Sequence, residues 1–339
     1  ETKNCRKNVG LFDLTPFSKF ELKGDKAFEE LQRICTANIK NEPGKCVYTQ
    51  MLNNDGGIEA DVTVVCLERN YFRIISSAAT RERDKFHINK NLTTNIELTD
   101  VTDKYCVFGL FGPKSRELIS SISKEDFSNK NFKFATGKKI KINNADTWVQ
   151  RLSYVGELGY EIYVEFDKAI EIYSLFLNEG KKYNISNCGM HSLDIMRMES
   201  GFLHWGHDIS PEENQYQAGL EFAISFKKNV DFIGKDSLLK IKDSKINKRL
   251  MMFKLKDTMP GEPLLLHDEP IYLDKQIIGR TTSGNYSFNF NTNLTFGYVN
   301  SGNTKESLKS KNIYIEVEKS KYVAEVLDSP LNNKNYKNL

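Results

Sequence analysis

A glycine-rich turn between two apolar segments constrains the fold of this chain more than any other feature. Residues 53–57 read Asn-Asn-Asp-Gly-Gly, and a Gly-Gly pair between strand-like segments is a strong hairpin signal. The flanking segments, 46–52 and 58–65, are apolar and contain β-branched residues, so both are predicted to be strands. This pattern places the region in an antiparallel sheet.

A carboxylate lies inside the second of these strands. The alternation of a strand puts Asp61 and Thr63 on one face and Val62 and Val64 on the other. Strands disfavour aspartate, so Asp61 needs a partner, a solvent-facing position or a chemical role. From the local pattern alone an exposed aspartate beside a turn is the more common outcome, and only motifs further along the chain favour a functional role.

Helical and strand-like patterns alternate along the rest of the chain. Strands are expected at residues 71–76 and 105–111 and twice within 148–164, and a loop with one short strand is expected at 123–144. Helices are predicted from apolar spacing and from helix-stop signals at 24–34, 81–91, 113–122, 169–182 and 189–200. From residue 251 onward the pattern changes to short strands and glycine turns, which indicates a separate small β domain. This combination predicts an α+β fold.

Composition excludes several classes of function. A chain of 339 residues can form two or three domains. Its net charge of +3, from 48 basic and 45 acidic residues, is not the charge pattern of a nucleic-acid-binding protein. No apolar run approaches the roughly 18 residues of a transmembrane helix, and no secretory leader is visible. We therefore expect no membrane partner and a location in the cytoplasm, or in the mitochondrial matrix of a eukaryote.

The cysteines indicate neither a disulfide framework nor a metal site. All six are scattered without a CxxC pair, and chain size and spacing favour reduced, buried thiols. The five histidines do not cluster with them at ligand spacing, so we expect no zinc site and no other metal site.

An ordered set of motifs covers nearly the whole chain. The motifs are residues 9–14, 48–64, 152–164, 189–202, 204–209, 232–235 and 278–284. In this order they resemble the tetrahydrofolate-dependent aminomethyltransferase family, the glycine-cleavage T-protein and its relatives. Two further segments, 14–20 and 203–208, are more similar to the folate-binding C-terminal half of dimethylglycine and sarcosine dehydrogenases than to free-standing T-protein. Since the chain begins at Glu1, we expect it to be a fragment or the C-terminal part of a longer flavoprotein.

The resemblance implies a three-domain cloverleaf of the α+β class around a central folate pocket. Antiparallel sheets with flanking helices would form two lobes, and a small β-barrel would close the C-terminus. The expected boundaries are 1–45 with 140–246 for a discontinuous folate-binding lobe, 46–139 for a second lobe carrying Asp61, and 247–339 for the barrel.

The resemblance also assigns four residues to folate binding. Glu161 would accept two donors from the edge of the pterin, although a surface glutamate paired with a lysine is the commoner fate of such a residue. Tyr48 and Tyr154 match folate-lining tyrosines of the family and offer aromatic faces. Thr63 shares the face of Asp61 and completes the set.

Asp61 matches the family's acidic residue beside the nitrogens that accept the one-carbon unit. A carboxylate there can orient the attacking nitrogen, take its proton and stabilise nearby positive charge, so no covalent enzyme intermediate is needed. Two positions depart from T-protein. Ser77 stands where T-protein has an asparagine, and Leu193 stands where it has a folate-contacting arginine, which fits the dehydrogenase branch better.

Four further polar residues look attractive but are interpreted as structural. Arg197 and Glu199 are expected to form a partly buried ion pair within their helix and its neighbours. His204 and His207 flank a tryptophan, and packing of the loop explains two isolated histidines better than catalysis does.

The sequence therefore predicts tetrahydrofolate-dependent methylene transfer from an oxidised N-methyl amine, such as dimethylglycine or sarcosine, giving 5,10-methylenetetrahydrofolate. The partner would be an upstream flavin domain or a small lipoylated carrier. Because no GxGxxG fingerprint is present, we expect no FAD within these residues. Three alternatives stay open: a stand-alone glycine-cleavage aminomethyltransferase acting on a lipoyl carrier, a folate-dependent demethylase, and a non-catalytic folate-binding protein. The last usually carries a cysteine motif that the surroundings of Cys188 do not match.

Overall fold

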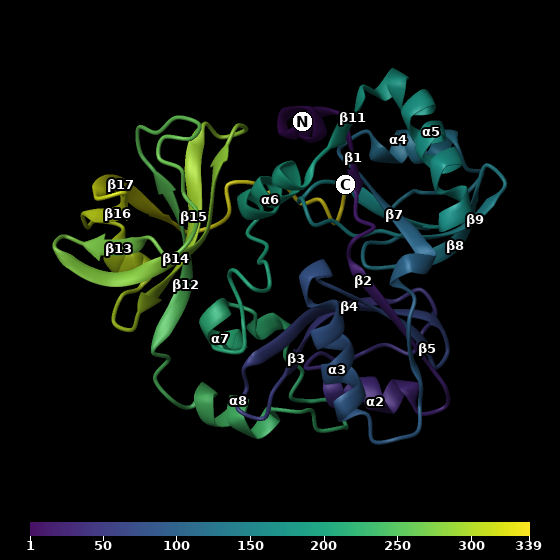
Figure 1. The fold of residues 1–339 in the computed structure, drawn as a ribbon, viewed down its shortest axis with the longest axis horizontal. Helices are drawn as coiled ribbons and strands as arrows, with labels where there is room; N and C mark the ends of the chain where they lie inside the picture. The colour runs from purple at the N-terminus through teal and green to yellow at the C-terminus, as the bar shows by residue number, and fades with distance from the viewer.

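The computed structural model describes residues 1–339 as three bodies packed around a common centre (Figure 1). Two are sheets of six and five strands with helices, and the third is a closed six-stranded barrel. This architecture confirms the predicted α+β cloverleaf and its C-terminal barrel.

The five-stranded sheet carries Asp61 and is called the Asp61 sheet. Its strands, in spatial order, are β3 (Cys46–Leu52), β4 (Ile58–Glu68), β5 (Tyr71–Ser76), β2 (Ser18–Lys23) and β6 (Leu98–Asp100), all antiparallel. The helices α2 (Ala27–Ile34) and α3 (Arg81–Asn91) cover it (Figure 1). Between sheet and helices lies an apolar core that includes Val62, Val64 and Ile88.

The predicted hairpin joins β3 to β4. The Asn53 Oδ1 atom accepts hydrogen bonds from the backbone N–H groups of Asp55 and Gly57, at 3.0 and 2.9 Å. A Cβ atom on Gly57 would lie 2.1 Å from the carbonyl oxygen of Pro211, so the close approach of a later loop requires glycine there.

The six-stranded sheet carries Glu161 and is called the Glu161 sheet. Its spatial order is β11 (Ile185–Cys188), β1 (Val9–Asp13), β7 (Tyr105–Phe111), β10 (Gly159–Glu165), β9 (Ala145–Gln150) and β8 (Gly137–Ile142). Its helices are α4 (Ser115–Ser121), α5 (Ala169–Gly180), α1 (Thr2–Lys7) and α6 (Met190–Glu199). In Figure 1, α4 and α5 lie on the outer side of this sheet, whereas α6 lies toward the centre of the molecule.

The barrel closes in the order β12 (Lys248–Leu255), β15 (Thr292–Asn300), β14 (Gln276–Ser287), β13 (Pro270–Leu273), β16 (Ile313–Val317) and β17 (Ser320–Leu327). The remaining α-helices are α7 (Gln215–Ala218), α8 (Lys235–Lys242) and α9 (Lys305–Leu308). The 3₁₀ turns are η1 (Ala78–Thr80), η2 (Thr102–Lys104), η3 (Phe166–Lys168), η4 (Lys181–Tyr183) and η5 (Glu221–Ala223). No helix combines the length and the apolarity that crossing a membrane requires.

Strand pairing departs from the predicted lobe boundaries. Strand β2 pairs with β5 along its whole length, so residues 18–23 and helix α2 belong to the Asp61 sheet and not to the lobe predicted for 1–45. Conversely, β7 pairs with β1 and β10, so 105–111 belongs to the Glu161 sheet and not to the 46–139 lobe. These pairings join segments far apart in the chain, and a reading of local patterns contains no information about them.

The last residues also leave the body to which they were assigned. After β17 the chain returns to the Glu161 sheet, where Arg151 donates hydrogen bonds to the carbonyl oxygens of Lys337 and Leu339, at 3.2 and 2.7 Å. The barrel itself therefore ends near Leu327, and the tail belongs with the first lobe.

One apolar core is shared by all three bodies. It contains side chains from the inner faces of both sheets, from α6 and from the barrel, among them Val65, Phe111, Tyr163, Met196 and Phe296. This shared core brings the surfaces that carry Asp61 and Glu161 together.

Candidate active site

Two carboxylates, one from each sheet, lie on the faces that border the shared core. Asp61 on β4 and Glu161 on β10 are both half-buried. Their neighbours Val62 and Ile162 point the other way, into the separate core behind each sheet. The alternation predicted around Asp61 is therefore confirmed, and β10 shows the same pattern around Glu161.

Asp61 is held by its own hairpin. Gln50 lies opposite it in the register of β3 and β4, and the Gln50 Nε2 atom donates to the Asp61 Oδ1 atom at 2.7 Å. Burial raises the pKa of the Asp61 carboxyl to about 6, although hydrogen bonds from Gln50 and from the Tyr48 hydroxyl oppose the shift. A carboxylate with a pKa near 6 is suited to accepting a proton at neutral pH.

Glu161 has the same kind of partner in the other sheet. Gln150 lies opposite it in the register of β9 and β10, and its Nε2 atom donates to the Glu161 Oε2 atom at 2.7 Å. The Tyr163 hydroxyl donates to that same oxygen at 3.3 Å, which leaves Oε1 without a protein donor. Burial raises the pKa of this carboxyl as well.

The predicted tyrosines both stack on phenylalanines. The ring of Tyr48 lies 6.2 Å from that of Phe222, with 21° between the planes, and 38% of Tyr48 and 75% of Phe222 are exposed. Tyr154 stacks on Phe202 at 6.1 Å, and its hydroxyl donates to the carbonyl oxygen of Leu203 at 2.7 Å. Both pairs present flat apolar surfaces.

Asp61 contributes to the pKa shifts of two of the predicted tyrosines, Tyr48 and Tyr154, which indicates that these residues lie near it. Burial raises the pKa of the Tyr48 hydroxyl, and the charge of Asp61 adds to the shift. Burial likewise raises the pKa of Tyr154, and Asp61 contributes to that shift too. Thr63 lies opposite Tyr48 in the β3–β4 register, on the face of Asp61. The structure thus brings Tyr48, Asp61, Thr63 and Tyr154 to one region, and Glu161 lies across the shared core.

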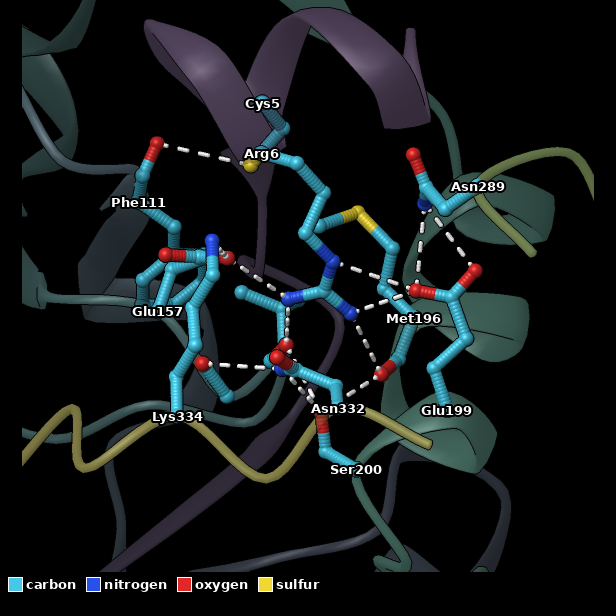
Figure 2. A network of polar contacts seen from close by, with 12 residues as sticks. Cys5, Arg6, Phe111, Glu157, Met196, Glu199, Ser200, Asn289, Asn332 and Lys334 are labelled. Carbon is cyan, nitrogen blue, oxygen red and sulfur yellow. Dashed lines mark hydrogen bonds and ion pairs between the residues drawn. The ribbon is translucent and has the colours of Figure 1, made fainter. Parts of the chain in front are cut away.

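The loop that carries Tyr154, residues 153–158, is anchored by the polar network in Figure 2. The Arg6 Nη1 atom donates to the carbonyl oxygen of Val155 at 2.5 Å, and the Arg6 Nη2 atom pairs with the Glu199 Oε2 atom at 2.6 Å. Arg6 also pairs with Glu157 at 3.2 Å. One buried guanidinium thus ties the N-terminal helix, the Tyr154 loop and α6 together.

The C-terminal tail closes the same network from the other side. Asn332 donates to the carbonyl oxygen of Gly156 at 3.0 Å, and Lys334 pairs with Glu157 at 2.7 Å. Gly156 has a φ of +71°, and a Cβ atom there would lie 2.2 Å from the Ser200 Oγ atom. The conformation of the Tyr154 loop therefore depends on a glycine and on two distant segments of the chain (Figure 2).

Arg197 and Glu199 are both buried. They do not pair with each other, and each forms an ion pair with a residue from another segment of the chain. Arg197 pairs with Asp208 at 2.6 Å and with Asp194 at 2.9 Å, and it donates to the Ser283 Oγ atom of the barrel at 2.6 Å. This contact fixes the barrel against α6.

Neither the two histidine side chains nor the cysteines form a hydrogen bond with Asp61 or Glu161. The rings of His204 and His207 lie 4.6 Å apart, and no hydrogen bond links either side chain to Asp61 or Glu161. All six cysteines are free thiols and five are buried. No three His, Cys, Asp or Glu side chains are grouped closely enough to hold a metal ion.

Comparison with known families decides what this arrangement represents. A family model of the GCVT N-terminal domain matches residues 1–228, and a model of the glycine cleavage T-protein C-terminal barrel domain matches residues 248–332. The chain belongs to the folate-dependent aminomethyltransferase family of the glycine-cleavage T-protein. A crystal structure of aminomethyltransferase T from Bartonella henselae superposes with a TM-score of 0.85 over 97% of this chain and 88% of that one, at 20% identity, which supports the fold.

Two kinds of protein are similar to this chain, amine-oxidising enzymes and aminomethyltransferases. The 4-methylaminobutanoate oxidase (formaldehyde-forming) of Paenarthrobacter nicotinovorans is 38% identical over 84% of this chain, and human mitochondrial dimethylglycine dehydrogenase is 30% identical over 98%. The chain spans about a third of each, 34% and 38% of their lengths. An aminomethyltransferase of Halothermothrix orenii is 32% identical over 88% of this chain and 82% of its own length.

Sequence reasoning missed three residues of the site. Gln50 could have been found, because a tight hairpin fixes the register that sets it opposite Asp61. Gln150 and Phe222 carry no comparable local signal, since the first depends on the pairing of β9 with β10 across a loop and the second on a distant 3₁₀ turn.

Proposed function

We propose that this chain is a tetrahydrofolate-dependent one-carbon transferase that takes the methylene unit of an oxidised N-methyl amine and delivers 5,10-methylenetetrahydrofolate. The observation that carries the proposal is the pair of half-buried carboxylates, Asp61 and Glu161. Each is hydrogen-bonded by a glutamine across its own hairpin or strand pair, and the two border one core from opposite sheets. Two carboxylates in separate settings suit two roles, one in binding and one in proton transfer.

Glu161 is the binding carboxylate in this proposal. Its Oε2 atom is occupied by Gln150 and Tyr163, whereas its Oε1 atom is free to accept an N–H donor of a pterin edge. The exposed stacked pair Tyr48 and Phe222 offers aromatic surface for a flat ring. The residues present therefore fit tetrahydrofolate, which supplies, when bound, the nitrogen nucleophiles that accept the carbon unit.

Asp61 is the proton acceptor. A pKa of about 6 keeps most of this carboxyl ionised at pH 7, and yet the group is basic enough to take a proton that a folate nitrogen loses as the new carbon–nitrogen bond forms. The carbon of an iminium donor bonds to two folate nitrogens, its bond to the donor nitrogen breaks, and the amine leaves as an ammonium ion with the two protons lost by folate, one of them passed on by Asp61. Its negative charge also stabilises positive charge on an approaching iminium-type donor. Thr63 and Tyr154 lie beside it and help to define the orientation of the bound ring.

The names of the relatives support an N-methyl amine as the carbon source. 4-Methylaminobutanoate, dimethylglycine and sarcosine, which appear in the names of three relatives, all carry a methyl group on nitrogen. A flavin domain that oxidises the amine would be the partner, with the reaction in the cytoplasm or in the mitochondrial matrix of a eukaryote. A second candidate is transfer from a lipoyl-bound aminomethyl group, which is favoured by the aminomethyltransferase that matches over 82% of its own length.

The test is a partition assay. A flavoenzyme oxidises [methyl-¹³C]sarcosine or dimethylglycine in the presence of tetrahydrofolate, with this chain or with its Asp61→Asn variant, and ¹³C NMR measures free formaldehyde against labelled 5,10-methylenetetrahydrofolate. We expect the unmodified chain to shift label into the folate product faster than the variant does. Equal product with and without the chain would contradict the proposal, and transfer only from an aminomethylated lipoyl carrier would select the second candidate.

A further inference from the structure

We propose that Gln215 is a positioning residue for Asp61 and acts through Gln50. This inference rests on the proposed function, because it concerns the carboxylate to which that function assigns the proton transfer. Gln215 is the first residue of the short helix α7, far from both strands of the Asp61 hairpin in the sequence.

The three side chains form a continuous relay. The Gln215 Nε2 atom donates to the Gln50 Oε1 atom at 2.6 Å, and the Gln50 Nε2 atom donates to the Asp61 Oδ1 atom at 2.7 Å. The Gln215 Nε2 atom also donates to the Thr36 Oγ1 atom at 3.1 Å. Gln50, Gln215 and Thr36 are completely buried, so no water competes for the two bonds that Gln215 donates.

The Asp61 carboxylate determines which side-chain atoms donate and which accept in this relay. An ionised carboxylate only accepts hydrogen bonds, so Gln50 must present its nitrogen to Asp61 and its oxygen to the other side. That oxygen is then a buried acceptor which needs a donor, and Gln215 supplies it. Without Gln215, the amide of Gln50 loses the contact that holds it in this orientation.

Gln215 is itself held rigidly. Asn214 caps α7 through a capping box with Gln217, and the Gln217 Nε2 atom donates to the Asn247 Oδ1 atom at 2.6 Å. The Gln215 Oε1 atom, by contrast, is buried without a hydrogen-bond partner. An unpaired buried carbonyl oxygen costs stability, so overall stability does not explain an amide at this position. The contact that its nitrogen makes with Gln50 does explain it.

No positively charged side chain contributes to the pKa shift of Asp61. The titratable groups coupled to Asp61 are Tyr48 from β3, Asp84 from α3 and Tyr154 from the 153–158 loop. Asp84 disfavours the ionised form of Asp61, whereas the Tyr48 hydroxyl favours it. The Gln50 amide, oriented by Gln215, is therefore one of two groups that favour the reactive, ionised form.

The experiment compares Gln215→Leu with Asn293→Leu, a control variant that removes a buried amide of the barrel, where the Asn293 Nδ2 atom donates to the carbonyl oxygen of Pro263, without touching the relay or the cap of α7. Selective ¹³C labelling of aspartate carboxyl carbons, with the Asp61 signal assigned by its loss in Asp61→Asn, gives the titration midpoint of Asp61 in the folate-free protein. We expect Gln215→Leu to raise this midpoint by about half a pH unit to one unit, because a hydrogen bond to the charged form is weakened. Asn293→Leu should leave the midpoint unchanged.

Two results would overturn the positioning role. One is an unchanged Asp61 midpoint in folded Gln215→Leu, and the other is an equal shift in both variants. If Gln215→Leu does not fold, Gln215→Asn, which is shorter by one methylene group, must show the same upward shift. The titration requires no turnover. A protein that transfers no methylene to tetrahydrofolate would refute the proposed function, and the titration of Asp61 would still test the positioning role of Gln215. In an active protein, the acid limb of the pH–rate profile should move with the midpoint.

Discussion

Replacing Asp61 with asparagine should stabilise the protein at neutral pH while it abolishes transfer. The pKa of the carboxyl rises on folding from its ordinary value of 3.8 to about 6, because burial penalises the charged form more than its hydrogen bonds favour it. A shift of about 2 units corresponds to roughly 3 kcal/mol of destabilisation at a pH above both values. Asp61 is only half-buried, so solvent screening reduces the expected gain to about 1–2 kcal/mol.

The sign of the pH dependence follows from the same shift. The folded-state pKa is raised, so the penalty is complete above about pH 6 and is lost as the pH falls through 3.8, below which Asp61 is protonated in both states. Asparagine retains an oxygen for the Gln50 donor, so the hairpin contact survives the substitution. The advantage of Asp61→Asn over the unmodified chain should therefore be largest near pH 7.5 and vanish near pH 3.

Urea unfolding at several pH values measures this difference. The indole N–H of Trp205 donates to the carbonyl oxygen of Ile58 at the start of β4, so its fluorescence reports on the Asp61 sheet. Asp55→Asn, at an exposed position in the adjoining turn, serves as the control and should change little at any pH. An Asp61→Asn variant that is no more stable at pH 7.5, or whose advantage does not depend on pH, would refute the reasoning.

Three further predictions test other parts of the structure. Glu161→Gln should weaken tetrahydrofolate binding by about 10- to 100-fold in equilibrium dialysis, because a hydrogen bond to a charged acceptor is lost, and an unchanged affinity would contradict its assignment. Arg197→Met should lower the free energy of unfolding by about 3–5 kcal/mol in chemical denaturation, since Asp208 is left buried and unpaired, and adding Asp208→Asn should recover most of that loss. Glu30 has a pKa of about 2, because hydrogen bonds led by that from Thr93 outweigh the effect of burial, so its contribution is complete above pH 4.5 and is lost as the pH falls toward 2. Glu30→Gln should therefore be less stable than the unmodified chain at pH 6 and equally stable near pH 2 in acid-unfolding curves.

Local patterns predicted the hairpin and its carboxylate well. The segments predicted at 46–52 and 71–76 are β3 and β5 with the same bounds, and Asp61 and Thr63 share the predicted face. These features depend on alternation and on a Gly-Gly turn, which neighbouring residues determine by themselves. The sequence therefore carries enough information for the part of the site that lies within one hairpin.

Features that depend on distant segments were not predictable in the same way. Strand β2 precedes the Asp61 hairpin in the chain and yet pairs with β5 in the same sheet, which the lobe boundary at residue 45 missed. Gln215 reaches Gln50 across 165 positions, and Phe222 reaches Tyr48 from a 3₁₀ turn with no periodic signal. Burial and partner choice at such positions are set by tertiary packing, which periodicity does not encode.

The most direct test of the central claim, that Glu161 binds folate and Asp61 serves the chemistry, is calorimetric titration of the purified chain with tetrahydrofolate alongside Glu161→Ala and Asp61→Ala. We expect saturable binding that is lost in Glu161→Ala and largely retained in Asp61→Ala. Binding that survives in Glu161→Ala, or no binding by the unmodified chain, would contradict it.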